Sequence, residues 1–531
     1  MLDVLTVAAI GAIVLLMYHW VAKKYEYFLT KPVPCVKPTF GFGSNAPLLF
    51  RRIDMTTLLT RLYNAYPDCK IMGFYNFTDP IYLLRDPQVI KKIAMKDFDF
   101  FMDHSTMTGD SLTEDEVDGE SLFENMLFLL RGQKWRDMRA TLSPAFTGSK
   151  MRHMFGLVAE CGQSMVEFLV SEARAGKTLE YEMKDVFSRF GNDVIATVAF
   201  GIRMDAFREP ENQFYLKSKQ VFDIQSIRVV LKLLLLKAMP RLMRKLKLGF
   251  IHSSSTDYFK IMIVDNMKQR EAHGILRNDM IQMLMEVRKG GIKTDADFGS
   301  VEESHFVKST HSRKWTDNEL IAQCLQFFLA GFDTVSTCLI FLTYELAINP
   351  DIQKRLYDEV LETNQSLNGN PLTYDALQKM QYMDMVVSEV LRLWPVNAVS
   401  DRVCVKDYHY TDDSGTHFVI EKGMLMLIPT IAIHRDPKYY PCPDKFDPER
   451  FSEENRSRIN IESYMPFGVG PRSCIGSRLA LMEVKSIIYY LVKEFRLEPT
   501  EKTQIPLRLT KKMSTLAPEG GVWLELNPRH S

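Results

Sequence analysis

The stretch that decides the fold runs Phe467-Gly-Val-Gly-Pro-Arg-Ser-Cys-Ile-Gly476. It places one cysteine, Cys474, in a loop with three glycines and a proline, just before an apolar run that favours a helix. Glycine permits close backbone approach and positive φ, while proline stiffens the chain. Backbone amides and the start of a helix favour a thiolate over a thiol, and Arg472 adds a cation nearby. The loop therefore predicts a fixed, ionised sulfur.

The sulfur of Cys474 has several conceivable uses, and an inert cysteine in a glycine-rich loop is the commonest. Zinc or an iron–sulfur cluster would need more cysteines at metal-binding spacing, but Cys442 and Cys404 are distant in sequence and form no Cys-x-x-Cys pair. A nucleophile would need a histidine base, which the sequence does not place. The remaining use is a single thiolate bound axially to haem iron, where it promotes O–O cleavage.

Five residues of this stretch carry a specific resemblance: Phe467, Gly470, Arg472, Cys474 and Gly476 match the haem-binding signature of the cytochrome P450 superfamily. Further family motifs follow in the same order, so the resemblance covers nearly the whole chain. The chain is similar in style to microsomal insect enzymes of the detoxifying ninth family. The resemblance implies a mainly α fold with small β-sheets, haem b as cofactor, and monooxygenation of a lipophilic substrate with O2.

A long apolar helix is predicted in the second half of the chain. It should begin after Trp315, where Thr316 and Glu319 have the spacing of a capping box. It should end near Ile348, because Pro350 cannot continue a helix.

The centre of this helix reads Ala330-Gly-Phe-Asp-Thr-Val-Ser-Thr337 and contains poor helix formers. Such local conflicts often mark functional sites. Small Ala330 and Gly331 would leave room above a flat ring, although they would also suit a groove for a crossing helix. The family motif Ala/Gly-Gly-x-Asp/Glu-Thr is met at every position. The resemblance therefore implies catalytic roles for Asp333 in proton delivery and for Thr334 in hydrogen bonding to dioxygen.

Trp135 and Arg139 share one face of a predicted short helix, because they lie four residues apart. An indole and a guanidinium are good donors to a carboxylate, but a surface helix with a tucked tryptophan would look the same. The resemblance implies that the haem propionates are held by a set of four donors: Trp135, Arg139, Arg402 and Arg472.

Glu389 and Arg392 lie three residues apart at the end of a predicted helix over 383–393. Such a pair occurs on many solvated helices and means little alone. The resemblance adds Arg450, in Pro448-Glu-Arg-Phe451, and implies that all three form a buried structural ion network.

The N-terminal run from Val4 to Val21 is almost wholly apolar and long enough to span a bilayer. Lys23 and Lys24 follow it, which places the N-terminus in the lumen. We expect an uncleaved anchor at 1–22, a proline-rich spacer at 23–45 and a haem-thiolate catalytic domain at 46–531, on the cytosolic face of the endoplasmic reticulum. A cleaved signal peptide is the alternative, but a basic start and a clear cleavage site are missing.

Composition agrees with one large catalytic domain. The chain has 531 residues, of which 46% are hydrophobic, and no linker or low-complexity tract divides it. Lysine plus arginine and aspartate plus glutamate both number 66, so no basic excess favours nucleic-acid binding. The eight cysteines are scattered without a disulfide framework, which indicates a reducing compartment.

Smaller elements follow from alternating and apolar runs. Strands are expected at 71–75, 81–84, 418–429, 507–509 and 522–526, and a helix at 479–495. The resemblance places pocket-lining segments at 122–130, 396–400 and 513–517, and a lid that dips into lipid at 221–251.

The resemblance also implies partners. The electron donor should be NADPH–cytochrome P450 reductase, with cytochrome b5 as a second candidate, received by a basic surface that comprises Lys134, Arg136, Arg472 and Arg478. Three alternatives remain: a hydroxylase of an endogenous hormone, fatty acid or terpenoid; a haem-thiolate enzyme that rearranges peroxides; and a non-catalytic haem sensor or sterol-binding membrane protein. The pair Asp333 and Thr334 argues against the peroxide enzyme.

Overall fold

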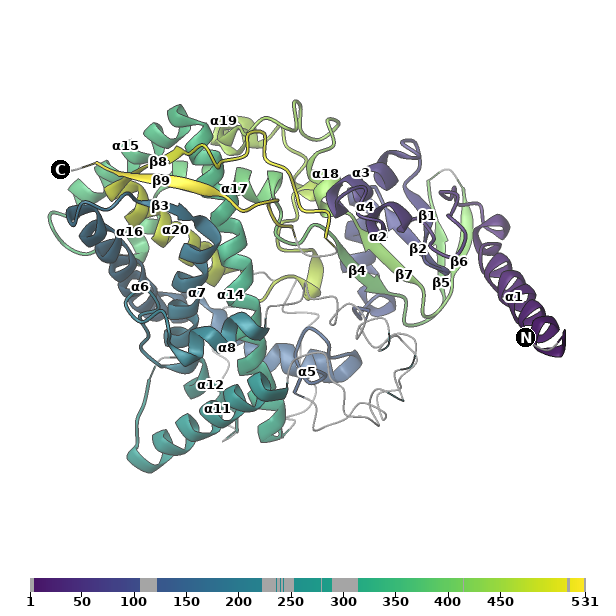
Figure 1. Ribbon diagram of the computed structural model, residues 1–531, viewed down its shortest axis with the longest axis horizontal. Helices are drawn as coiled ribbons and strands as arrows, with labels where there is room; N and C mark the ends of the chain where they lie inside the picture. The colour runs from purple at the N-terminus through teal and green to yellow at the C-terminus, as the bar shows by residue number, and fades with distance from the viewer. Residues whose placement is uncertain are drawn as a thin grey trace.

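The computed structural model describes residues 4–105, 122–221, 253–277, 279–288, 314–413, 415–512 and 516–529, and the single positions 235, 239 and 242. Most of the lid expected at 221–251 and most of the wall expected at 513–517 lie outside these residues. Helices dominate the fold, and the small sheets lie at its periphery (Figure 1). The helices are α1 (Val4–Lys24), α2 (Ala46–Leu49), α3 (Met55–Asn64), α4 (Pro87–Lys91), α5 (Gly132–Leu142), α6 (Gly148–Arg174), α7 (Met183–Phe200), α8 (Gln213–Val221), α11 (Ser253–His273), α12 (Met280–Arg288), α14 (Asp317–Ile348), α15 (Pro350–Ser366), α16 (Tyr374–Gln378), α17 (Gln381–Leu393), α18 (Thr430–His434), α19 (Glu453–Arg456) and α20 (Ser477–Glu494).

Helix α14 runs through the helical part of the molecule and packs against α7, α11, α17 and α20. Its start confirms the predicted capping box: the Thr316 hydroxyl accepts from the Glu319 N–H at 3.3 Å, and the Glu319 carboxylate accepts from the Thr316 N–H at 2.9 Å. It ends at Ile348, as predicted from Pro350. Although α14 is apolar enough to span a membrane, most of it is buried in protein, so it is a core helix.

Helices α7 and α14 cross closely because each has a glycine at the contact. A Cβ at Gly331 would lie 2.8 Å from the Cδ1 of Ile195, and a Cβ at Gly191 would lie 3.2 Å from the carbonyl oxygen of Phe332. The missing side chain of Gly331 therefore faces α7. The groove for a crossing helix explains this glycine, and a place above a flat ring does not.

Three small sheets complete the fold. The strands are β1 (Ile71–Asn76), β2 (Asp79–Leu84), β3 (Glu180–Glu182), β4 (Ser400–Val403), β5 (Tyr408–Thr411), β6 (His417–Ile420), β7 (Leu425–Ile428), β8 (Phe495–Pro499) and β9 (Trp523–Pro528). They form sheets of order β1-β2-β7-β4, β3-β9-β8 and β5-β6. The predicted hairpin is confirmed, with Ile71 opposite Leu84, and β2 pairs in parallel with β7. No strand forms at 507–509, where Leu509 makes only an isolated bridge to Pro518.

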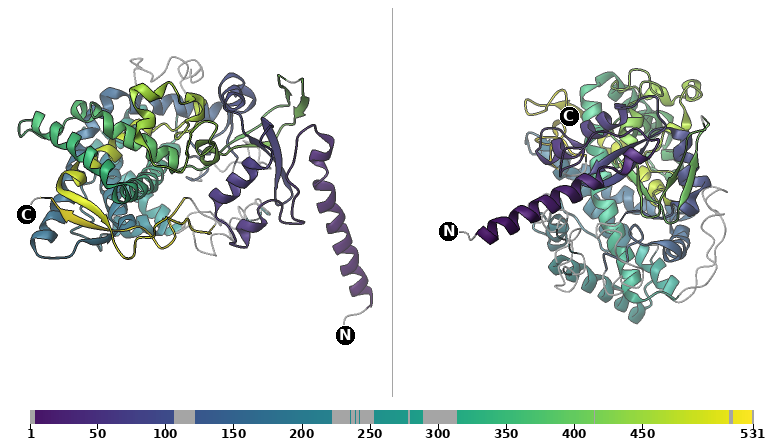
Figure 2. Two further views of the ribbon diagram at one scale, coloured as in Figure 1. Left: turned by 90° about the horizontal axis from the view of Figure 1, so that it is seen from above. Right: turned by 90° about the vertical axis from the view of Figure 1, so that its right-hand side faces the viewer.

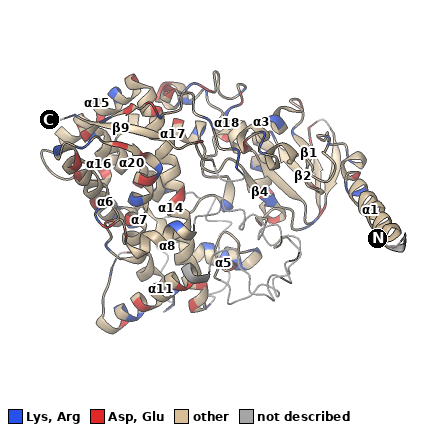
Figure 3. Ribbon diagram, viewed as in Figure 1, with Lys and Arg blue, Asp and Glu red and all other residues tan. Residues whose placement is uncertain are grey.

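Helix α1 projects from the sheet end of the molecule (Figures 1 and 2). It is long and apolar enough to cross a membrane and is almost entirely exposed. Charged side chains are spread over the rest of the described chain, whereas α1 carries them only in its last turn (Figure 3).

The proline-rich stretch after α1, within the spacer expected at 23–45, packs against the first sheet. The N–H of Gly73 donates to the carbonyl of Pro34 at 2.8 Å, and the N–H of Val36 donates back to Gly73 at 3.1 Å. Val33 is buried. Backbone pairing with β1 thus holds the stretch in place.

Candidate active site

The loop that carries Cys474 is shaped by a close backbone contact. Gly470 has φ of +74°, and a Cβ there would collide with the carbonyl oxygen of Ala94, in a π-helical turn over Lys92–Lys96. Only glycine satisfies both conditions. The N–H of Cys474 donates to the carbonyl of Phe467 at 2.9 Å and closes the loop.

The electrostatics of the Cys474 sulfur differ in two respects from the expectation of an ionised sulfur beside Arg472. Burial raises the pKa of the Cys474 thiol, while the N–H of Gly476 and the charge of Arg139 oppose this rise. Arg139 comes close because its Nη1 donates to the carbonyl of Ser473 at 2.9 Å. The nearby cation is therefore Arg139, and the prediction of Arg472 in that role was wrong. A bound metal would supply the remaining stabilisation of the thiolate, since metals bind the deprotonated form.

One face of α14 is accessible although the helix is otherwise mostly buried. Ala330 and Thr334, one turn apart, are exposed. Phe146 contacts both α14 and the loop that carries Cys474. Its ring centroid lies 5.4 Å from that of Phe327 on α14. A Cβ at Gly476 would lie 3.8 Å from the Phe146 ring, which is an ordinary contact. The protein itself thus leaves room for a side chain at Gly476, so a group bound on the open side would explain the glycine.

Asp333 points away from this face and toward α7. Its carboxylate lies 2.5 Å from the Nζ of Lys184, which also donates to the hydroxyl of Ser336 at 3.0 Å. The side chains of Lys184 and Asp333 are 38% and 28% exposed, so this cluster reaches solvent. The sequence analysis did not find Lys184, because it lies far from the motif in sequence.

Arg472 is an interior residue. Its Nε donates to the carbonyl of Met102 at 2.8 Å, and its Nη2 donates to Leu130 at 2.8 Å and to the Asp103 carboxylate at 3.2 Å. Its guanidinium carbon lies 4.0 Å from the centre of the Trp135 ring, a cation–π contact. The structure thus brings together Trp135 and Arg472, as predicted.

Two buried guanidinium groups keep N–H groups without a protein acceptor. Nη1 of Arg472 and Nε of Arg402 have no hydrogen-bond partner, although Nη2 of Arg402 donates to the carbonyl of Val469 at 2.7 Å. Burial lowers the pKa of Arg472 to about 9 and that of Arg402 to about 10. Buried polar groups are rarely left unpaired, and buried charges want counter-charges. An anionic group bound here, such as a haem propionate, fits both requirements.

A histidine that the sequence analysis missed lies in the same region. The Nδ1 of His104 is 2.9 Å from the Asp401 carboxylate, which also accepts from the N–H of Ser105 at 2.7 Å. Burial, opposed by this hydrogen bond, lowers the pKa of His104 to about 4. Arg402 follows Asp401 directly, so this neutral histidine borders the buried cations.

The predicted ion network is formed. The Glu389 carboxylate accepts two hydrogen bonds from Arg392, at 2.7 and 2.8 Å, and lies 3.3 Å from the Nε of Arg450. The side chains of Glu389 and Arg392 are fully buried and that of Arg450 is 11% exposed.

His434 connects this network to the cysteine loop. The Nη1 of Arg392 donates to the carbonyl of His434 at 2.9 Å, and the Nε2 of His434 accepts from the N–H of Met465 at 2.9 Å. Met465 lies just before the loop that holds Cys474. Burial lowers the pKa of His434 to about 3, so the ring is neutral and can accept this bond. The network therefore braces the segment that positions the sulfur.

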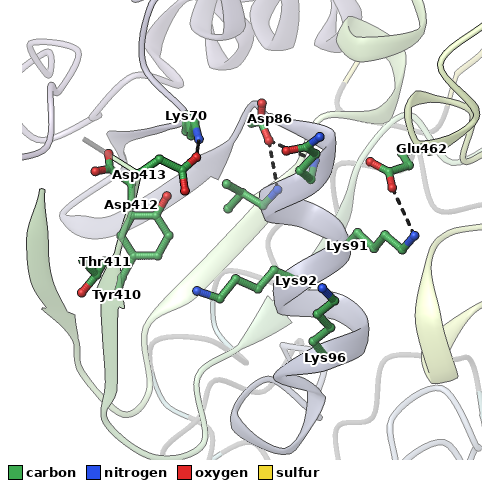
Figure 4. A pocket seen from close by; sticks show the side chains of 12 residues that line it. Lys70, Asp86, Lys91, Lys92, Lys96, Tyr410, Thr411, Asp412, Asp413 and Glu462 are labelled. Carbon is green, nitrogen blue, oxygen red and sulfur yellow. Dashed lines mark hydrogen bonds and ion pairs between the residues drawn. The ribbon is translucent and has the colours of Figure 1, made fainter. Parts of the chain in front are cut away.

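A surface pocket of about 460 Å³ lies on the outer side of the turn that contacts Gly470 (Figure 4). Lys92 and Lys96 line one wall, and Tyr410 of β5 lines the other. Because Ala94 of the same turn contacts Gly470, the pocket lies next to the cysteine loop but outside it.

Among the residues that the structure describes, no three histidine, cysteine or acidic side chains lie together in a way that could hold a metal ion. A family model described as Cytochrome P450 matches residues 41–524. The chain belongs to the cytochrome P450 family. It is 41% identical to Cytochrome P450 9e2 of Blattella germanica, over 98% of this chain and 97% of the relative. It is also 41% identical to Probable cytochrome P450 9f2 of Drosophila melanogaster, over 97% of each, and 33% identical to Cytochrome P450 6k1 of Blattella germanica, over 97% and 95%.

These relatives confirm the resemblance to the insect ninth family. As a cytochrome P450, the protein is a monooxygenase that binds haem through a cysteine thiolate. The exposed, apolar α1 indicates that this P450 is anchored in a membrane.

The basic surface expected for the electron donor needs correction in this P450. Arg472 is buried, with a side chain 2% exposed, so it cannot meet a partner. Lys134 is paired with Glu319 at 2.8 Å, and Arg136 is paired with Asp99. The carboxylate partners of these three residues, Glu319, Asp99 and Asp103, come from other segments of the chain, so the sequence did not reveal the pairing.

Proposed function

We propose that Cys474 is the axial ligand of the haem iron, and that the protein oxidises lipophilic foreign compounds such as insecticides or plant toxins. Haem bound here supplies the activation of O2, with one oxygen atom entering the substrate and the other leaving as water. One observation carries the proposal. Cys474 is exposed, as are Ala330 and Thr334 on α14, and two buried arginines close to the cysteine loop each have an N–H without an acceptor.

The cofactor-binding residues divide into three groups. Arg402 and Arg472, with Trp135 and Arg139, would hold the propionates, whose negative charge would offset that of the buried guanidinium groups. Phe467, Gly470 and Gly476 set the path of the loop, while Ala330 and the backbone of Gly331 would leave room for the bound group on α14.

Proton handling falls to α14. The Thr334 hydroxyl donates to the carbonyl of Ala330 at 2.6 Å, and a rotation about χ1 would free its proton for donation at the accessible face of α14. Asp333 is turned toward Lys184 and solvent. It therefore serves as the outer member of a relay, and Thr334 serves as the inner one.

The electron donor is proposed to be NADPH–cytochrome P450 reductase, with cytochrome b5 as a second donor, on the cytosolic face of the endoplasmic reticulum. Lys92 and Lys96 offer a better contact than the surface first expected, because they line the pocket directly outside the cysteine loop. The double variant Lys92→Glu/Lys96→Glu should raise the reductase concentration needed for half-maximal reduction. Lys354→Glu on α15 is the control, and equal effects of both would reject this surface.

The experiment that tests the function is turnover of a panel of lipophilic compounds with reductase and NADPH. Oxidation of several unrelated compounds supports detoxification. High activity on one endogenous hormone, fatty acid or terpenoid alone would favour the alternative of a biosynthetic hydroxylase. Product formation without NADPH would indicate peroxide rearrangement, and no turnover of any compound would favour a haem- or sterol-binding protein.

A further inference from the structure

The segment that follows α1 is fixed to the first sheet by side-chain hydrogen bonds. The hydroxyl of Tyr75 donates to the carbonyl of Tyr25 at 2.9 Å, and the hydroxyl of Tyr25 donates to the carbonyl of Phe77 at 3.1 Å. The Phe28 ring is buried over Gly73, where a Cβ would lie 2.7 Å from it. The end of the anchor helix is thereby joined to β1.

A second set of bonds joins the same segment to the turn between β6 and β7. The Glu421 carboxylate accepts from the hydroxyl of Tyr27 and pairs with Lys31. The Nζ of Lys31 also donates to the carbonyl of Val419 at 2.8 Å, and the hydroxyls of Tyr27 and Tyr82 lie 3.0 Å apart. Because several strands hold this segment, α1 leaves the body at a set position.

A tight loop over residues 39–43, here called the aromatic loop, lies against α1. The N–H of Thr39 donates to Gly43 at 2.9 Å, and the N–H of Gly43 donates back at 2.8 Å. Gly41, at the tip, has φ of +77°. The two residues beside it, Phe40 and Phe42, are 47% and 41% exposed. Exposed phenylalanines at the tip of a constrained loop need an apolar partner.

The position of Tyr18 shows which partner fits. The Phe40 ring stacks on the Tyr18 ring, with centroids 4.9 Å apart. Tyr18 lies six residues before Lys24, which is about 9 Å along a helix axis. Lys23 and Lys24 mark the level of the lipid headgroups, so a side chain stacked on Tyr18 lies at or below that level.

We propose that the aromatic loop inserts Phe40 and Phe42 into the bilayer interface beside the anchor helix, as a second lipid contact of the catalytic domain. The bilayer is a better partner for this loop than a second copy of the protein, because the loop packs against α1, a helix whose exposed apolar surface itself requires lipid. Phe50 extends the apolar surface: it is 57% exposed and its ring lies 5.3 Å from that of Phe42. The contact would limit the tilt of the catalytic domain on the membrane.

This inference rests on the insertion of α1, which belongs to the proposed function, and the test separates the two. Full-length protein is prepared with the photoreactive residue p-benzoylphenylalanine at one position, in four variants: Phe40→p-benzoylphenylalanine and the same change at Phe42, Val14 and Gln365. Each is reconstituted in phosphatidylcholine vesicles and irradiated, and lipid adducts are measured by mass spectrometry. Position 14 reports the anchor. Gln365, exposed on α15 at the far end of the molecule, is the background.

We expect adduct yields at positions 40 and 42 similar to that at position 14 and well above that at position 365. Lipid adducts at position 14 with only background yields at positions 40 and 42 would reject insertion of the aromatic loop and leave insertion of α1 supported. Background yields at all four positions would reject both insertion of the aromatic loop and insertion of α1. Crosslinks from position 40 to a second copy of the chain, in place of lipid, would also reject the proposal. Replacement of one aromatic ring by another keeps the loop folded, and a wild-type carbon monoxide spectrum of each variant checks this.

Discussion

Loss of the Glu389 carboxylate offers the sharpest test of the network that braces the haem side of the fold. Glu389 accepts two hydrogen bonds from Arg392, one from Arg450 and one from the N–H of Asp447 at 2.9 Å. The change Glu389→Gln keeps the shape but removes the charge and puts an amide N–H group against donors. Arg392, with no exposed side-chain surface, then lacks its counter-charge.

An uncompensated buried charge costs about 3–5 kcal/mol. That is roughly a hundred- to several-thousand-fold change in a folding equilibrium, since about 1.4 kcal/mol is tenfold. Total stabilities are only about 5–15 kcal/mol, so Glu389→Gln should unfold at much lower denaturant. The assay is guanidinium unfolding, followed by circular dichroism and by the reduced carbon monoxide spectrum. Because Arg392 reaches the cysteine loop through His434, the spectrum should be lost first.

A matched control comes from the exposed pair of Lys354 and Asp358, with side chains 74% and 53% exposed. Asp358→Asn also removes one carboxylate from an ion pair and should leave the midpoint unchanged, because solvent screens exposed pairs. A wild-type midpoint for Glu389→Gln, or an equal loss for Asp358→Asn, would refute the reasoning.

Two further predictions concern buried and catalytic charges. Burial raises the pKa of Glu483 to about 8. Between about pH 4.5 and pH 8 the Glu483 carboxyl therefore keeps its proton in the folded protein but loses it in the unfolded chain. The free energy of unfolding consequently falls as pH rises through this window. Glu483→Gln should therefore be more stable than the wild type in thermal unfolding at pH 8, with a smaller gain at pH 5; a gain that does not grow with pH would contradict this. Lys184→Met removes the cation beside Asp333 and should lower the product formed per NADPH consumed, whereas Lys177→Met, at a surface pair, should not. If the two variants form the same amount of product per NADPH consumed, Lys184 has no role in the proton path.

Local chemistry explains what could be predicted from the sequence. The capping box at Thr316 and Glu319 and the hairpin of β1 and β2 depend on neighbouring residues, and both are confirmed. The cysteine signature and the helix motif at Asp333 and Thr334 were recognisable because their spacing is local, and the family comparison confirms the family that they indicated.

Tertiary contacts explain what could not be predicted. The cation near Cys474 is Arg139, which reaches it from α5 through the carbonyl of Ser473, and no sequence distance reveals that. Lys184 and His104 find their carboxylates across the fold. Gly331 fitted two interpretations, and only the position of Ile195 showed that a crossing helix requires it.

The packing of the proline-rich stretch could not be predicted for a similar reason. Its prolines favour a stiff, extended chain, which predicts a spacer but not the surface on which it packs. An extended chain can also lie along a sheet edge, as Val33 to Val36 do beside Gly73.

The central claim is that the sulfur of Cys474 binds haem iron, and one spectrum tests it directly. The purified protein, reduced with dithionite and exposed to carbon monoxide, should show the red-shifted Soret band of thiolate-ligated haem. Cys474→Ser should lose that band, and Cys442→Ser, at another exposed cysteine, should keep it. A thiolate-type band that persists in Cys474→Ser, or a wild-type protein that binds no haem, would contradict the account.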